Sequence, residues 1–281
     1  MTLRDWLVQS EAQLLDGPHP DRAKRDAETL LLYLIGKNKA WLMAHAEDDF
    51  AGCTAIRYAG LLERRRKGEP IQYIIGETEF YGMPFRVTPD VLIPRPETEH
   101  LVEKCVALAT QKDARILDVG TGSGAISIAL AVHLPHAYLT AVDISEAALS
   151  IARDNAKLNH VADRIRFLNG DLLTPVSDEQ FDIIVSNPPY VPNTDRALIS
   201  VEVREHEPAV ALFGGDDGLA IFRRLIPAAY AAVAPGGYLA FEFGFSQMSD
   251  VEFLLKSAGF QKIEFTHDLQ GIPRIASAQK I

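Results

Sequence analysis

The sequence predicts an α/β protein in which a small bundle of helices precedes a larger domain built on a mostly parallel sheet. Apolar residues recur at helical spacing from residue 1 to about residue 70. From about residue 96 onward, short apolar runs alternate with helical patterns, which is typical of parallel strands joined by helices. A length of 281 residues with 47% apolar content is sufficient for one large and one small core.

The N-terminal region, residues 1–72, is expected to form four or five short helices. Breaks in the helical pattern fall at Gly17-Pro18-His19-Pro20 and at Gly36-Lys37-Asn38. The last of these helices ends in a basic run, Arg64-Arg65-Arg66-Lys67. The interpretation that we favour for this run is a solvated helix C-terminus, where positive charge interacts well with the helix dipole. A docking patch for a substrate or for ribosomal RNA is the alternative.

A β-hairpin linker is predicted for residues 73–95. Apolar residues alternate there with turn residues at Tyr81-Gly82 and Pro89-Asp90, and such a linker is able to roof a neighbouring site. The larger domain, residues 96–281, then begins with Pro96, which suits the first position of a helix.

A glycine-rich loop follows the first strand pattern of the larger domain. The apolar run Ile116-Leu117-Asp118-Val119 leads directly into Gly120-Thr121-Gly122-Ser123-Gly124, and a helical pattern comes next. Glycines in this position let the backbone turn tightly against a ligand at a helix N-terminus. Alone, the loop is compatible with dinucleotide or phosphate binding. Because it lacks the Lys-Ser/Thr ending of a P-loop, hydrolysis of a nucleoside triphosphate is disfavoured.

Two acidic residues follow the next two strand patterns. Asp143 comes about 20 residues after the loop, where an acidic side chain can accept hydrogen bonds from both ribose hydroxyls of a nucleoside. A plain helix N-cap is its alternative role, although Ser145 could cap equally well. Asp171 could accept from an adenine amino group while Leu172 flanks the ring, and an Asx turn explains Asp171 about as well.

The most informative motif is Asn187-Pro188-Pro189-Tyr190, which ends a further apolar strand pattern. The side-chain oxygen of Asn187 and the carbonyl of Pro188 can together accept both hydrogens of one NH2 group, and the Tyr190 ring can stack on its plane. That arrangement suits methylation of a planar nitrogen. A strand followed by a proline-rich turn is the alternative.

The order of these motifs resembles the class I S-adenosylmethionine-dependent methyltransferases, in the branch that methylates planar amino or amide nitrogens. The resemblance narrows at the stretches Gly76-Glu77-Thr78-Glu79-Phe80-Tyr81-Gly82, Pro94-Arg95-Pro96-Glu97-Thr98-Glu99, Glu207-Pro208 and Gly214-Gly215-Asp216-Asp217-Gly218-Leu219. These are similar to the HemK family of glutamine methyltransferases, and the likeness runs from about residue 70 to the C-terminus. Some relatives carry an aromatic residue beside the adenine where this chain has Leu172.

The HemK resemblance implies a seven-stranded Rossmann-like sheet whose final strand is antiparallel. It implies S-adenosyl-L-methionine as the cofactor and class I peptide chain release factors as protein substrates, methylated on the glutamine of their Gly-Gly-Gln motif. The cofactor would lie against residues 120–124, Asp143, Asp171, Leu172 and Asn187, and the substrate glutamine against residues 187–190. Thr98 and the nearby backbone N–H groups at the start of the helix expected from Pro96 could receive the methionine carboxylate of the cofactor, with an ordinary helix cap as the equal alternative.

Two other functions stay open at this point. The same motif serves enzymes that methylate an exocyclic amino group of a nucleobase in RNA or DNA, because the edge of a base offers a similar planar NH2. The chain could also be a nucleoside-binding module without catalysis. A net charge of −10 and a pI of about 5.3 disfavour direct binding to duplex DNA, since many phosphates would have to be neutralised.

Composition also limits the setting in which the protein works. Cys53 and Cys105 are far apart in the sequence and the eight histidines are scattered, so we expect reduced thiols and no metal site. The N-terminus carries charges from its first turn, and no apolar window is long enough to span a bilayer. We therefore expect a cytoplasmic protein, and we further expect it to be a monomer.

Overall fold

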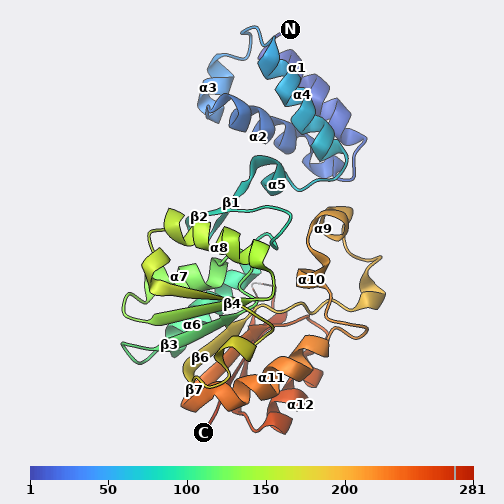
Figure 1. Cartoon of the computed structure of the whole chain (residues 1–281). Helices are drawn as coiled ribbons and strands as arrows, with labels where there is room; N and C mark the ends of the chain where they lie inside the picture. Colours follow the sequence, from blue (N-terminus) through green and yellow to red (C-terminus); the bar gives the residue numbers. More distant parts are fainter. Residues whose placement is uncertain (269) are drawn as a thin grey trace. The chain divides into compact units, whose positions relative to one another are not determined.

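The computed structural model describes every residue except residue 269. It divides the chain into two compact units, whose elements are labelled in Figure 1. The first unit comprises Met1–Gly76 together with Ile199–His206, and the second comprises Glu77–Leu198 together with Glu207–Ile281. A short segment from the second half of the chain therefore belongs with the N-terminal helices, which the sequence did not predict.

The first unit is a bundle of helices around an apolar core. The side chain of Thr2 and that of Asp5 cap the first helix reciprocally. Leu30, Leu31 and Tyr58 are fully buried between the helices, and the Tyr58 hydroxyl donates to the carbonyl of Ala27 at 2.9 Å. The elements of this unit are α1 (Leu3–Leu15), η1 (Pro20–Arg22), α2 (Ala23–Ile35), α3 (Lys39–Ala44), α4 (Cys53–Arg66), α5 (Ile71–Ile75) and α9 (Val201–His206).

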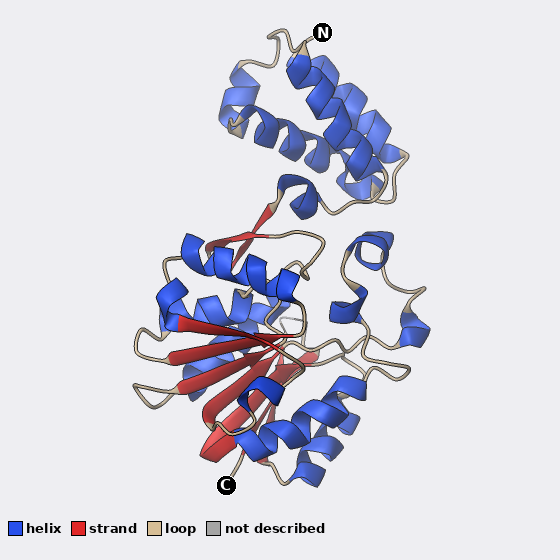
Figure 2. Cartoon of the chain, in the orientation of Figure 1, coloured by secondary structure: helices blue, strands red, loops and turns tan. Residues whose placement is uncertain are grey.

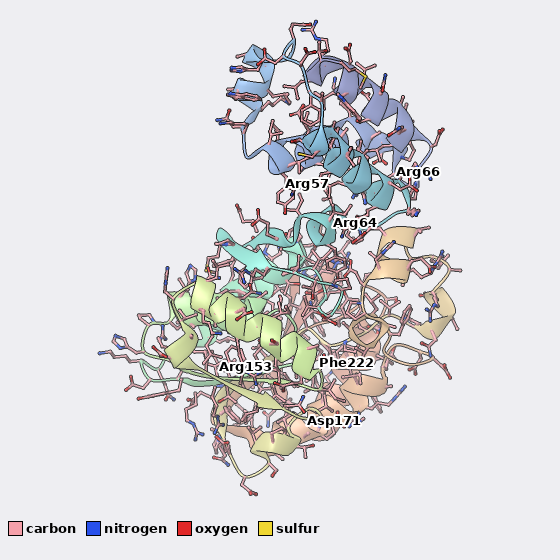
Figure 3. All side chains as sticks on the ribbon, turned by 45° about the horizontal axis from the view of Figure 1, so that its top comes forward. Arg57, Arg64, Arg66, Arg153, Asp171 and Phe222 are labelled. Atoms are coloured by element: carbon pink, nitrogen blue, oxygen red, sulfur yellow. The ribbon has the colours of Figure 1, made fainter. Side chains whose placement is uncertain are left out.

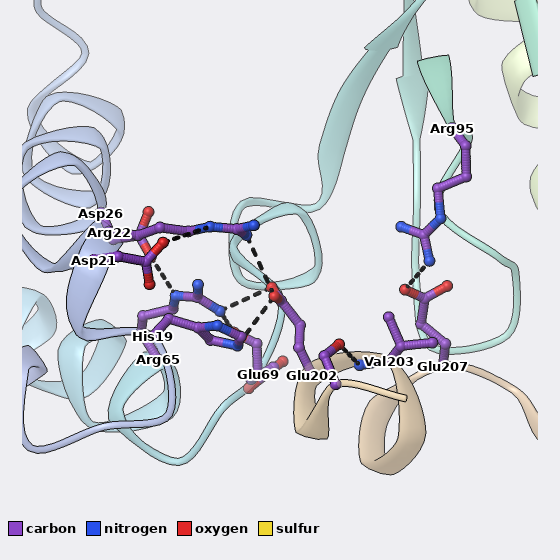
Figure 4. A network of polar contacts seen from close by, with 11 residues as sticks. His19, Asp21, Arg22, Asp26, Arg65, Glu69, Arg95, Glu202, Val203 and Glu207 are labelled. Carbon is purple, nitrogen blue, oxygen red and sulfur yellow. Dashed lines mark hydrogen bonds and ion pairs between the residues drawn. The ribbon is translucent and has the colours of Figure 1, made fainter. Parts of the chain in front are cut away.

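A buried polar cluster joins α9 to the N-terminal helices of the same unit (Figure 4). Arg65 at the end of α4 donates to Asp26 at 2.6 Å and to Glu202 of α9 at 2.9 Å. His19 lies 3.1 Å and Arg22 lies 3.6 Å from the other oxygen of Glu202. Because the Arg65 side chain is only 3% exposed, this charge requires both carboxylates to offset its loss of hydration.

The rest of the basic run is paired locally on α4 and just after it. Arg64, which is labelled in Figure 3, donates to Glu69, and Arg66, labelled there too, donates to Glu63 at 2.8 Å. These exposed pairs cost little to break, since surface ion pairs contribute about 0 to 1 kcal/mol. The favoured interpretation, a charged helix end, accounts for Arg64 and Arg66, whereas Arg65 has an internal structural role that the sequence did not predict.

The second unit is built on the expected seven-stranded sheet, which confirms the predicted fold class. Its strand order is β5-β4-β3-β6-β7-β9-β8, and β9 is the strand that runs antiparallel to its two neighbours. β3 is the first of these strands in the chain, yet β4 and β6 lie on its two sides. The strands are β3 (Arg115–Val119), β4 (Tyr138–Asp143), β5 (Ile165–Asn169), β6 (Phe181–Ser186), β7 (Val233–Glu242), β8 (Gln261–His267) and β9 (Pro273–Gln279).

Helices cover both faces of the sheet (Figure 2). One core cluster contains residues of α6 (Glu99–Leu108), α7 (Ala125–His133) and α8 (Glu146–Leu158), and the other contains residues of α11 (Ala220–Ala232) and α12 (Met248–Ala258). The strands are apolar on both faces, as expected for a parallel sheet between two helical layers. Short elements complete the unit: η2 (Pro96–Thr98), η3 (Ala162–Arg164), η4 (Thr174–Val176), η5 (Asn193–Asp195) and α10 (Ala209–Leu212).

The predicted hairpin is present as β1 (Glu77–Phe80) and β2 (Met83–Arg86), an antiparallel pair in the second unit. Phe80 and Phe85 are buried in the same core cluster as α6 and α7 and contact each other edge to face, with centroids 6.0 Å apart. Asn155 of α8 fixes β2 from the other side by bonding both polar backbone groups of Arg86. The hairpin is therefore anchored to the larger fold.

Candidate active site

A cavity of about 220 Å³ opens at the carboxyl ends of the central strands of the second unit. The strand order reverses at this edge, where β3 lies between β4 and β6, and open parallel sheets bind ligands in such a crevice. Thr98, Ile221 and Arg224 contribute to the walls, and the other lining residues fall within 90–95, 119–126, 142–148, 170–172, 186–189 and 208–211.

Most of the residues singled out in the sequence line this one cavity. They come from four different strand ends and are residues 120–123, Asp143, Asp171, Leu172, Asn187, Pro188 and Pro189. In the part of the chain that the structure describes, Gly124 and Tyr190 are not among the lining residues. The segment after the hairpin, from Asp90 to Arg95, provides the roof that we expected from the linker.

The glycine loop has a backbone that only glycine adopts easily. Gly120, Gly122 and Gly124 have φ values of 73°, 54° and 82°, all in the left-handed region. A Cβ on Gly124 would lie 2.9 Å from a methyl carbon of Ile128 and 3.2 Å from the Cβ of Ala152. Gly124 therefore permits close packing of α7 against α8, while the earlier glycines shape the cavity wall.

Asp118 of β3 supports the glycine loop through hydrogen bonds, a role that the sequence did not predict. Its Oδ2 accepts from the Thr121 hydroxyl at 2.6 Å and from the Ser127 N–H at 3.2 Å. Its Oδ1 is buried without a hydrogen-bond partner among the described residues. Burial raises the pKa of this carboxyl to about 6, against the opposing effect of those hydrogen bonds.

Asp143 lines the cavity and also supports the glycine loop. One of its oxygens accepts from the Gly122 N–H at 2.8 Å and the other from the Ser145 N–H at 2.9 Å. Ser145 is the N-cap of α8, because its hydroxyl accepts from the Ala148 N–H. Asp143 is thus not the helix cap, and each carboxylate oxygen keeps a lone pair for a further donor. Burial raises the pKa of Asp143.

Asp171 and Leu172 follow β5, the strand next to β4. Asp171, labelled in Figure 3, forms an ion pair with Arg224 of α11, and both side chains line the cavity. Leu172 has a φ of 49°, an unusual value for a residue with a branched side chain. The pair with Arg224 was not predicted, because Arg224 lies on a helix far along the chain.

The Asn-Pro-Pro-Tyr segment is held by a chain of side-chain hydrogen bonds. The Asn187 NH2 group donates to the Thr98 hydroxyl oxygen at 3.1 Å, and that hydroxyl donates to Glu242 at 2.6 Å. The Tyr190 hydroxyl donates to the other oxygen of Glu242 at 2.9 Å. Glu242 ends β7 and is 3% exposed. Burial raises the pKa of Glu242, and burial followed by the nearby Glu242 charge raises the pKa of Tyr190.

These contacts bear on two of the residues singled out in the sequence, Thr98 and Tyr190. The single proton of the Thr98 hydroxyl is used on Glu242, so this hydroxyl has none left to give to a cofactor carboxylate. The Tyr190 ring packs partly buried against the core cluster of α11 and α12, with its hydroxyl on Glu242, and stacking of this ring on a substrate amide stays a prediction. Sequence reasoning missed Glu242 completely, because an acidic residue at a strand end carries no motif of its own.

Comparison with known proteins agrees with this geometry. The family model of the PrmC N-terminal domain matches residues 5–76, and that of the methyltransferase small domain matches residues 98–203. The release factor glutamine methyltransferase of Salmonella typhimurium is 40% identical over 276 residues, which cover 98% of each chain. The chain belongs to the release factor glutamine methyltransferase family. The enzyme of that name from Bradyrhizobium diazoefficiens is 42% identical over 93% of this chain and 89% of its own length.

Membership confirms the resemblance to the HemK family that the sequence motifs predicted. Solved structures support the fold alone. The hMettl16 catalytic domain, in complex with a MAT2A 3′UTR hairpin, is similar to this chain with a TM-score of 0.59 and a sequence identity of 16%. That likeness covers 81% of this chain and 82% of the other.

Two further observations concern metals and membranes. Among the described residues, no cluster of three or more His, Cys, Asp or Glu side chains could hold a metal ion. A search of the same residues finds no helix long and apolar enough to cross a membrane. Both cysteines are free, Cys53 at the surface and Cys105 in the core.

Proposed function

We propose that this protein transfers a methyl group from S-adenosyl-L-methionine to the side-chain amide nitrogen of the glutamine in the Gly-Gly-Gln motif of class I peptide chain release factors. The observation that carries the proposal is that Asn187 and Pro188 line the same cavity as the glycine loop and Asp143. A planar amide nitrogen held at Asn187 would thus lie in one cavity with a nucleoside ligand. Family membership supports the choice of a release factor glutamine as that amide.

The residues present fit S-adenosyl-L-methionine. Gly120 and Gly122, both in the left-handed region, add no side chain to this wall, and Asp143 offers free lone pairs for ribose hydroxyls. Asp171 can accept from the adenine amino group beside Leu172, while Arg224 holds its other oxygen. When bound, this cofactor supplies an electrophilic methyl group on a sulfonium sulfur.

Positioning is the main contribution that the chain's own residues make to the reaction. An amide nitrogen is a weak nucleophile, because its lone pair is delocalised into the carbonyl group. Alignment of reacting groups can contribute roughly 7 to 11 kcal/mol to lowering a barrier. The Asn187 side-chain oxygen and the Pro188 carbonyl accept the two N–H groups, and these bonds strengthen as the nitrogen gains positive charge. We assign no general base: the proton leaves to water after transfer.

A methyl-transfer assay with labelled cofactor tests this proposal. We expect label on a class I release factor, and loss of that label when the glutamine of its Gly-Gly-Gln motif is replaced. Duplex DNA and RNA offered at equal concentration should stay unlabelled, because the net charge of −10 opposes phosphate binding. Label on a nucleobase with none on the release factor would refute the proposal in favour of the nucleobase alternative, and no transfer at all would favour the non-catalytic one.

We further propose that residues 1–72 recognise the body of the release factor. One exposed glutamine offers too few contacts to select a single protein, so specificity requires a second surface. A chain that begins at Glu69 should methylate intact release factor far more slowly than the full chain does. A short Gly-Gly-Gln peptide should lose much less, because it does not reach that surface. Equal losses of kcat/KM on both substrates would mean that this region only stabilises the fold.

The truncation needs a matched control, because it also removes Arg65 and Asp26, which hold Glu202 of α9. Glu202→Gln in the full chain weakens that anchor and keeps the N-terminal region. If the control matches the truncation on both substrates, the loss comes from a released α9 rather than from a missing recognition surface. We also propose that the protein acts as a monomer in the cytoplasm, where release factors function.

A further inference from the structure

The side chains of Asn187, Thr98 and Glu242 form a hydrogen-bond relay with one direction, and Tyr190 is a second donor to Glu242. The Thr98 hydroxyl donates its single proton to Glu242 at 2.6 Å. Only lone pairs of the Thr98 oxygen then remain for Asn187. The Asn187 amide must therefore turn its NH2 group towards Thr98 and leave its carbonyl oxygen for the cavity.

We propose that Glu242 is a positioning residue that sets the direction of the Asn187 amide, and thereby determines that the site accepts an NH2 group rather than a carboxylate. This inference rests on the proposed function, since it concerns the same clamp, namely the Asn187 side-chain oxygen and the Pro188 carbonyl that accept the substrate NH2 group. Thr98 transmits the effect because it touches both partners. Glu242 itself lies at the end of β7, separated from Thr98 by 144 positions in the sequence.

The relay explains why a carboxylate is retained in a buried position. Glu242 has two neutral hydroxyl donors, at 2.6 Å and 2.9 Å, and no ion pair with it is found among the described residues within 4.0 Å. Burial of an ionised group is costly, and a well-packed neutral side chain at this position would cost less. An amide cannot replace it with the same effect, because an amide donates as well as accepts.

The substitution Glu242→Gln should reverse the relay. Tyr190 keeps its acceptor if the new amide oxygen faces it, and the new NH2 group then donates to the Thr98 oxygen. The Thr98 hydroxyl is left to donate to Asn187, whose amide must turn over and present its NH2 group to the cavity. The opposite placement leaves the buried Tyr190 hydroxyl without an acceptor, which is the more costly arrangement. The reversed clamp would oppose a glutamine NH2 group and favour a carboxylate.

The decisive readout is the choice between two ligands, measured without turnover. Two release factors are compared by calorimetry in the presence of S-adenosylhomocysteine: the natural protein, and one carrying Glu in place of the glutamine of its Gly-Gly-Gln motif. Contacts with the body of the release factor cancel in the ratio of the two dissociation constants. We expect the unaltered enzyme to prefer the glutamine form, and Glu242→Gln to shift the ratio at least tenfold towards the glutamate form. An unchanged ratio overturns the proposal.

Substitutions of Thr98 test whether the relay sets the direction of the Asn187 amide or only holds that amide in place. Thr98→Ser keeps the hydroxyl and should stay within a few-fold of the unaltered enzyme in kcat/KM. Thr98→Val removes the relay, so Asn187 is freed but not reversed: kcat should fall by roughly tenfold or more, with the ligand ratio moving less than in Glu242→Gln. The double variant Glu242→Gln/Thr98→Val should lose the reversed preference, because nothing then forces the amide to turn. A double variant that keeps the reversed preference would contradict the relay.

Two controls exclude a general loss of structure. Glu179→Gln makes the same change at a carboxylate that pairs with Arg115 and Arg166 at the amino ends of the strands, and it should leave the ligand ratio unchanged. Affinity for S-adenosylhomocysteine should stay within a few-fold of normal in all variants. If Glu242→Gln does not fold, the variants Thr98→Ser and Thr98→Val still test the proposal. Equal kcat for Thr98→Val and the unaltered enzyme overturns it. Failure of the proposed function is a separate result, namely no methylation of the release factor by the unaltered enzyme.

Discussion

The two ends of the cavity are held together in different ways. At the glycine loop, the supporting hydrogen bonds join residues close in sequence: Asp118 and Thr121 are 3 positions apart, Asp118 and Ser127 are 9 apart, and Asp143 and Gly122 are 21 apart. At the Asn187 end the separations are 89 positions to Thr98, and 144 and 52 positions from Glu242 to Thr98 and Tyr190.

This difference determines how substitutions at each end of the cavity should affect the protein. Several of the bonds at the glycine loop go to backbone N–H groups, so the loss of one side chain leaves most of that wall in place. The Asn187 end depends on side chains from three separate segments. Thr98 bonds both Asn187 and Glu242, and Glu242 also bonds Tyr190. Substitutions there should therefore affect turnover sharply, while substitutions at the glycine loop should affect cofactor affinity and stability more gradually.

The largest effect is expected from Asn187→Ala. This substitution removes the acceptor for the substrate amide and should lower kcat by roughly 10² to 10³, similar to the loss of one preorganised hydrogen-bonding group in other enzymes. Affinity for the cofactor should stay within a few-fold of normal, because the glycine loop and Asp143 are untouched. Single-turnover kinetics with calorimetry measures both quantities. Unchanged turnover would exclude the clamp.

The same difference explains which parts could be predicted from the sequence. The glycine loop, Asp143 and the Asn-Pro-Pro segment were found because each is a local pattern placed next to a strand signal. Glu242 and Arg224 were not found, because their partners are brought close only when β7 and α11 take their places in the fold. The hydrogen bonds from the Thr98 and Tyr190 hydroxyls to Glu242 could not be predicted for the same reason.

The pairing of α9 with the N-terminal helices was also beyond prediction from the sequence. Glu202 and Arg65 are 137 positions apart, and a basic run at a helix end gives no sign of which arginine is buried. The seven-stranded sheet with its antiparallel final strand, in contrast, was predicted from alternating strand and helix patterns together with the family resemblance. Local periodicity thus identified the elements, whereas the partners of individual charged side chains depended on the tertiary fold.

At the glycine loop, Asp143→Ala should weaken cofactor binding by about 1 to 3 kcal/mol, because two ribose hydroxyls lose their acceptor. The kcat at saturating cofactor should be largely restored. Asp143→Asn is the informative partner: it keeps one acceptor for the Gly122 or Ser145 N–H group and should bind cofactor better than the alanine variant. Titration calorimetry distinguishes them, and equal affinity of all three proteins would show that Asp143 only shapes the loop.

Asp118 should make stability depend on pH. Its folded pKa of about 6 exceeds the ordinary value of 3.8, so the folded protein binds the extra proton between these values. The stabilising contribution is therefore complete below about pH 4 and is lost as the pH rises through 6, a change of about 3 kcal/mol at 1.36 kcal/mol per pKa unit. Asp118→Asn should remove this dependence. Urea unfolding of both proteins from pH 4 to pH 7 tests it, and parallel curves would contradict the assignment.

The smallest effect is expected from Tyr190→Phe, which keeps the ring and removes only the hydroxyl. Glu242 then loses one of its two donors but keeps Thr98, so the direction of the Asn187 amide should survive. One hydrogen bond contributes about 0.5 to 1.5 kcal/mol, so kcat should fall by about two- to tenfold with normal cofactor affinity. A loss of a hundredfold or more would mean that the hydroxyl acts on the substrate directly. No loss at all would mean that Thr98 alone is sufficient to hold Glu242, and that any role of Tyr190 in turnover belongs to its ring.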